Sequence, residues 1–171
     1  MERGLEFYVT LAAVAELTVS GVRFVFNTPN DQSRPGYLGM GWTVSRRLSA
    51  GVRPAGPTAL IDMARARTAA SLWSEPTDVG LAAAEACSDV AFCEALLRHA
   101  PTEGVRTDRS AAYLAWRTAF GPLHYRVLLR NPEDPALGGI VFRLRRRGNA
   151  LEAAVVEQFV PDAVTGARLV G

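Results

Sequence analysis

The sequence predicts an α/β (α+β) fold in which helices flank a mixed sheet. The first observation is a helical spacing of apolar residues in three segments, 5–19, 78–99 and 108–119. The second is a change to period-two alternation in the residues that follow 123. The third is composition: 49% of the 171 residues are hydrophobic, which is enough to form a core.

The first fifty residues are expected to run helix, strand, loop, strand. The helical period of 5–19 stops at Gly21. The short segment 22–26, VRFVF, is β-branched and aromatic and predicts a buried strand. A loop rich in turn formers follows, NTPNDQSRPGYLGMGW, and 43–48 is expected to be a second strand.

The middle of the chain divides it. Residues 49–58 hold two Gly and two Pro with little periodicity, and 59–70 shows only a weak helical pattern. We therefore expect units at 1–50 and 76–171, joined by a linker at 51–75. Asp78 or Thr77 is the expected cap of the helix over 78–99, and Asp108 or Thr107 that of the helix over 108–119.

Three strands are expected near the C-terminus, at 124–131, 140–148 and 150–160. Their connections are short, and Gly148-Asn149 is typical of a tight turn, so they predict an antiparallel meander. Arg143, Arg145 and Arg147 alternate and share one strand face, which by default is solvated. No aromatic residues interleave with them, so we do not expect nucleic acid as a partner.

The spacing of cysteines and histidines and the lack of a long apolar run argue against a metal site and a membrane helix. The formal net charge is +2, and all 19 basic residues are Arg. Cys87 and Cys93 do not form a metal-ligand pattern and are expected to be buried free thiols, and His99 and His124 lack metal or catalytic partners nearby. No apolar run approaches the ~20 residues of a membrane helix, and no signal-peptide pattern is present, so we expect a cytoplasmic protein without a membrane partner.

The loop after residue 26 carries a family resemblance. Asn27 stands at the end of the expected strand, and the residues Ser33, Pro35-Gly36-Tyr37-Leu38 and Gly41-Trp42 follow. This pattern resembles the loop between the fifth and sixth strands of the GNAT superfamily of N-acetyltransferases. The resemblance covers this loop closely, and elsewhere it depends on the order and spacing of elements.

The resemblance implies an acyl-CoA-dependent N-acetyltransferase with acetyl-CoA as cosubstrate and an amine of a small molecule or peptide as acceptor. Asn27 would bind the pantetheine arm, and Tyr37 would protonate the departing thiolate. Arg3 and Gly4 would be the remainder of the pyrophosphate-binding loop. Glu157, on the last expected strand, lies where many such enzymes place a general base, although an ordinary strand carboxylate is the alternative.

By this resemblance, 1–50 corresponds to the C-terminal half of one GNAT-like unit and 76–171 to the N-terminal half of a second, so the fold would be partial or rearranged. Two explanations stay open: a truncated portion of a tandem-GNAT protein, or two halves that complement each other. Two further functions stay open, a non-catalytic interaction domain and a nucleic-acid binder using the arginine face. A homo-oligomer stays open as the partner.

Overall fold

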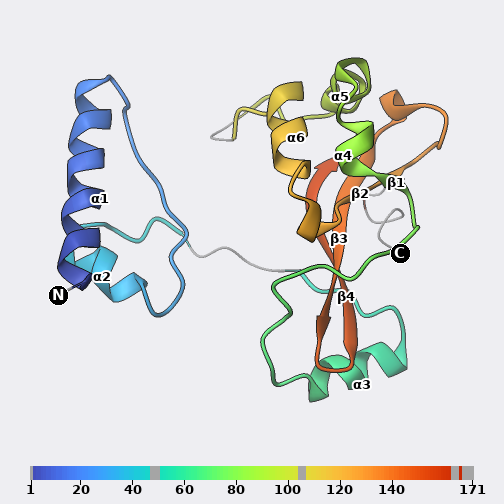
Figure 1. Ribbon diagram of the computed structural model, residues 1–171, viewed down its shortest axis with the longest axis horizontal. Coiled ribbons are helices and arrows are strands. Elements are labelled where there is room, and N and C mark those ends of the chain that lie inside the picture. The colour runs from blue at the N-terminus through green and yellow to red at the C-terminus, as the bar shows by residue number, and fades with distance from the viewer. Residues whose placement is uncertain (1, 47–50, 104–106, 163–165, 167–171) are drawn as a thin grey trace. The chain divides into compact units, whose positions relative to one another are not determined.

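The computed structural model describes residues 2–46, 51–103, 107–162 and 166, with side chains from residue 10 onward. The chain divides into two compact units, Met1–Gly51 and Val52–Gly171 (Figure 1). Each unit is described by itself below.

The first unit contains two helices and no strand among its described residues. Helix α1 spans Glu2–Val19 and α2 spans Arg34–Gly39. The expected helix over 5–19 is thus confirmed, and Gly21 ends it with a φ of 86°. Pro35 lies in the first turn of α2, and the Asn30 side chain accepts hydrogen bonds from the backbone N–H groups of Gln32 and Ser33.

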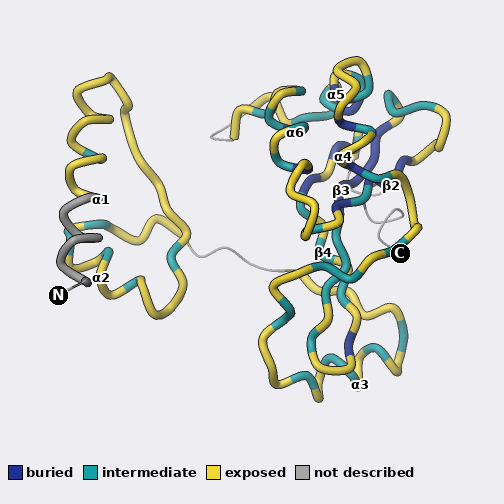
Figure 2. Tube along the Cα trace, in the orientation of Figure 1, coloured by how far each residue is buried: buried dark blue, intermediate teal, exposed yellow. Residues whose placement is uncertain are grey.

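The strand expected at 22–26 is wrong, and so is that at 43–48 for the described part, 43–46. Both segments are irregular. A strand needs a neighbour whose backbone groups complete its ladder, and no described residue of this unit supplies one. No residue of 10–46 is buried, so Phe24 and Phe26 stay exposed although their residue types favour a strand interior (Figure 2).

The second unit is built on an antiparallel sheet of four strands in the order β1-β2-β3-β4. The strands are β1 Leu81–Ala82, β2 Arg126–Leu129, β3 Gly139–Arg147 and β4 Ala150–Phe159. The predicted meander of three strands is confirmed. The expected mixed sheet is corrected, because every strand pair in the described residues is antiparallel.

The described residues of this unit form four helices and two 3₁₀ turns. The helices are α3 Pro57–Arg65, α4 Ala83–Ala86, α5 Val90–Leu97 and α6 Ala111–Thr118, and the turns are Gly121–Leu123 and Pro135–Leu137. The single helix expected over 78–99 is wrong. Asp89 interrupts it, because its carboxylate accepts a hydrogen bond from the Ala91 N–H at 2.8 Å and caps a new helix.

The cap of α6 is also corrected. Ser110, rather than Asp108 or Thr107, precedes the helix, and its Oγ accepts a hydrogen bond from the Tyr113 N–H at 3.1 Å. This bond satisfies one of the N–H groups that the first turn of a helix leaves without a partner.

The core lies between the sheet and the helices α4, α5 and α6. Ala83, Leu96 and Leu114 come from the helices and pack with Val127, Val141 and Phe159 of the strands. These helices cover one end of the sheet, and the β3–β4 hairpin continues beyond them toward α3 (Figure 1). The buried residues accordingly concentrate at the helix-covered end (Figure 2).

The interval expected to be a linker, 51–75, contains α3 and an extended segment that pairs with β3. The Ser71 N–H donates to the Arg146 carbonyl at 2.7 Å, and the Glu75 N–H donates to the Leu144 carbonyl at 3.0 Å. Residues 71–75 therefore pair with β3 along the same edge as β2, beyond the end of that strand. None of the helices that the structure describes is long and apolar enough to cross a membrane.

Candidate functional site

Among the polar side chains described in the second unit, Glu157 of β4 is the strongest candidate for a functional role. Its carboxylate is almost buried, with 7% of the side chain exposed. The Arg109 Nε donates to its Oε2 at 2.6 Å, and the Tyr113 hydroxyl donates to its Oε1 at 3.4 Å. Burial of a carboxylate is expensive unless it is paired and hydrogen-bonded, and both conditions are met here.

Two local features place these partners. The Ser110 cap fixes the start of α6, so Arg109 lies just before the helix and Tyr113 lies in its first turn. On the sheet, β4 has a bulge: Val141 pairs with Glu157, the adjacent Phe142 pairs with Val155, and Val156 is the extra residue. A bulge leaves the extra residue unpaired and re-aims the side chains next to it.

A shallow depression lies beside the carboxylate. Its volume is about 270 Å³, and its lining includes Pro101, Arg109 and the run 155–158 of β4. It therefore combines a guanidinium, a carboxylate and the bulged backbone in one open hollow. Such a set can position a polar group of a ligand and accept a proton from it.

The other predicted site residues lie in the first unit. Tyr37 is a partly buried residue of α2, and its ring meets that of Trp42 edge-on at 5.3 Å between centroids. Asn27 is exposed in the irregular segment that follows α1. Arg3 and Gly4 lie in the first turn of α1, where backbone N–H groups have no partner within the helix. Tyr37 and Asn27 thus share a unit with Arg3 and Gly4, whereas Glu157 belongs to the other unit.

The residues without an expected chemical role have structural partners. Cys87 and Cys93 are buried free thiols, as expected. Burial raises the pKa of the Cys93 thiol to about 12, and the neighbouring Cys87 adds to this effect. The His99 Nε2 lies 2.8 Å from the Ala136 carbonyl. No group of three or more His, Cys, Asp or Glu side chains suited to a metal ion occurs among the described residues.

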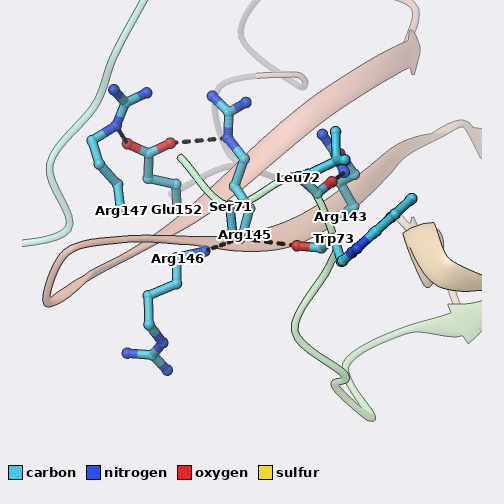
Figure 3. A network of polar contacts seen from close by, with 8 residues as sticks. All are labelled: Ser71, Leu72, Trp73, Arg143, Arg145, Arg146, Arg147 and Glu152. Atoms are coloured by element: carbon cyan, nitrogen blue, oxygen red, sulfur yellow. Dashed lines mark hydrogen bonds and ion pairs between the residues drawn. The ribbon is translucent and has the colours of Figure 1, made fainter. Parts of the chain in front are cut away.

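The arginines of β3 form the second polar cluster (Figure 3). Glu152 of β4 accepts from the Nε of Arg145 at 3.0 Å and from that of Arg147 at 2.5 Å. The hydrogen bond from Arg147 lowers the pKa of the Glu152 carboxyl, so this group stays charged. The Arg143 Nη1 instead donates to the Leu72 carbonyl at 3.0 Å.

Sequence reasoning missed the residue next to that carbonyl, Trp73. It was assigned to the linker, yet the fold brings it beside Arg143, 70 positions along the chain (Figure 3). The ring of Trp73 lies 6.1 Å from that of Phe120. The only sequence signal for Trp73 is that two large apolar residues, Leu72 and Trp73, stand together among small and polar ones.

Comparison with known proteins assigns no family to this chain: no protein-family model, no curated protein and no solved structure matches it.

Proposed function

We propose that this chain is an acyl-CoA-dependent N-acyltransferase of the GNAT type, which transfers an acetyl group from acetyl-CoA to an amine of a small molecule or peptide. The observation that carries the proposal is the bulge at Val156 next to the buried Glu157. It leaves Val156 without a partner residue on β3 and sets this residue beside a carboxylate and a hollow.

The order of elements in the second unit supports the proposal. Strand β1 is followed by helices and then by β2, β3 and β4 in one antiparallel sheet. This is the arrangement expected of the N-terminal half of a GNAT-like unit, to which 76–171 was assigned by resemblance. Arg3 and Gly4 lie in the first turn of α1, the part of a helix whose backbone N–H groups can bind phosphate.

The chemistry follows from these groups. The amine nitrogen attacks the thioester carbon, forming a C–N bond, while the C–S bond breaks. The Val156 N–H polarises the carbonyl oxygen, and Glu157 accepts the proton of the amine, directly or through water. The departing sulfur takes up a proton, a role that the resemblance assigns to Tyr37. The Arg109 Nε, which donates to Glu157 at 2.6 Å, must yield part of its contact when the amine binds.

Thermal unfolding with and without acetyl-CoA tests the proposal. A ligand at ~100 times its dissociation constant adds ~2.7 kcal/mol to the unfolding free energy. We expect such a shift in the wild type and in Glu157→Gln, with release of free CoA thiol in the presence of amines only in the wild type. A folded protein that shows no shift contradicts the proposal.

That negative result would favour the second candidate, a non-catalytic interaction domain descended from the same fold. One observation supports it: no residue of 10–46 is buried, so the first unit has no core of its own in the described residues. A unit of this size needs further apolar contacts to be stable.

A further inference from the structure

The C-terminal part of β3, residues 143–147, carries more positive than negative charge. Side chains of a strand point alternately to its two faces. Val141 faces the core, so the residues at every second position after it, Arg143, Arg145 and Arg147, continue that face beyond the helices. Figure 3 shows Arg145 and Arg147 on one side with Glu152, and Arg146 on the other. Arg145 and Arg147 share the one carboxylate of Glu152, and Arg143 makes no ion pair within the described part of the chain.

Exposed aromatic rings border this arginine row. The Leu72 carbonyl holds the Arg143 guanidinium, and Trp73, the next residue, is 53% exposed. Phe120, against which Trp73 packs, is also 53% exposed. Trp116, in α6, is 71% exposed. Rings of this size are seldom left in water without a partner, because they lose the most by exposure.

We propose that the arginine row and the adjacent rings of Trp73 and Phe120 bind single-stranded nucleic acid. The guanidinium groups would contact backbone phosphates, and the rings would stack on unpaired bases. This combination of a basic track with stacking platforms is how proteins hold single strands without reading sequence. Alternate residues of β3 lie ~7 Å apart, so the row spans ~14 Å, enough for a few nucleotides.

The chemistry favours this partner over other polyanions. A duplex hides the faces of its bases and would leave Trp73 and Phe120 unused. An acidic peptide would satisfy the arginines but offers no flat rings to the aromatic residues. An anionic membrane would need a broad basic surface, whereas Glu152 here neutralises part of the row.

Binding of a fluorescein-labelled dT20 oligonucleotide by the full chain, followed by anisotropy at several salt concentrations, tests the proposal. We expect micromolar or tighter binding at low salt that weakens with a log–log slope of about −2, since each phosphate contact on a single strand contributes ~0.7. Arg143→Gln should reduce the slope by ~0.7. Arg130→Gln is the matched control, because this exposed arginine lies beside Gly138 at the opposite end of β3.

The aromatic contribution is tested with a pair of variants. Trp73→Ala should weaken dT20 binding at least fivefold, because stacking on one base contributes ~1–3 kcal/mol. Trp73→Phe keeps a ring and should retain most of the affinity, and it also guards against a folding defect in the alanine variant. Circular dichroism of each variant verifies that the sheet is intact.

Three results would overturn the proposal. The first is no binding of dT20 at tens of micromolar protein in low salt. The second is equal or tighter binding of polyglutamate or of phosphatidylserine vesicles, which would assign the surface to another partner. The third is binding that Arg143→Gln and Trp73→Ala both leave as strong as in the wild type.

Discussion

Arg109 and Glu157 form an ion pair 2.6 Å long, although 48 positions separate them in the chain. The pair connects the residue before α6 to the bulge of β4. Its two ends differ in exposure, at 24% for the arginine side chain and 7% for the glutamate side chain. Removal of Arg109 therefore leaves a carboxylate that is almost buried, whereas removal of Glu157 leaves a guanidinium that solvent can reach.

We expect Arg109→Met to destabilise the fold more than Glu157→Gln does. The first leaves a buried charge without its partner, which costs ~2–4 kcal/mol, whereas the second leaves an arginine that can turn to water and costs ~1–2 kcal/mol. The free energies of unfolding come from urea titrations at pH 7. Glu133→Gln, which removes an exposed carboxylate in a loop, is the control and should change stability by less than ~0.5 kcal/mol.

The double variant completes this measurement. If the ion pair stabilises the protein, the two substitutions together should cost less than the sum of their separate effects by ~1 kcal/mol or more. Strictly additive effects would show that the contact contributes nothing.

Ser110→Ala should destabilise the second unit by ~1 kcal/mol, because it removes the hydrogen bond that the Tyr113 N–H donates to the Ser110 Oγ. Asp108→Ala should have little effect, although Asp108 and Thr107 are the two caps that the sequence pattern predicts. Urea midpoints of the two variants decide between these positions. A larger loss for Asp108→Ala would mean that the helix begins earlier than Ala111.

The elements predicted correctly from the sequence are those whose apolar periodicity can be recognised within the segment itself. The helical period of 5–19 and the alternation in the last three strands needed no partner to be recognised. The break between α4 and α5 was missed because the apolar spacing continues through Cys87 and Cys93. Only the side chain of Asp89, placed to cap a new helix, distinguishes two helices from one.

Non-local contacts explain the rest. Segment 22–26 has the composition of a strand, but a strand forms only where a second backbone completes its ladder, and the sequence does not say whether one is near. Among the site residues, Glu157 was found from its position on the last strand. Its partners Arg109 and Tyr113, and the place of Trp73 beside Arg143, depend on contacts between residues more than 40 positions apart.

Gly138→Ala should be far more damaging than Gly148→Ala, although both glycines have positive φ values, 94° and 57°. A Cβ at Gly138 would lie 2.5 Å from the Phe159 carbonyl oxygen, so the backbone must shift. At Gly148 the nearest atoms are at 3.7 Å, an ordinary contact, and only the left-handed conformation is unfavourable. We expect losses of ~3 kcal/mol or more and ~1 kcal/mol respectively, measured by thermal or urea unfolding. Equal losses would contradict the close packing of the two chain segments at Gly138.

Cys93 should make stability depend on pH in the alkaline range. Burial disfavours the thiolate and raises the pKa of the Cys93 thiol from its ordinary value of 9.0 to about 12 in the folded protein. The neutral thiol's contribution is thus complete below pH 9 and is lost as the pH rises from about 9 toward about 12, since the unfolded chain releases its proton first. Within that window, Cys93→Ala should reduce the pH dependence of the unfolding free energy by ~1.4 kcal/mol per pH unit. The difference between wild type and variant isolates this thiol from other groups that titrate in the same range. Parallel curves for the two proteins between pH 9 and 11 would show that the thiol is not buried in an apolar site.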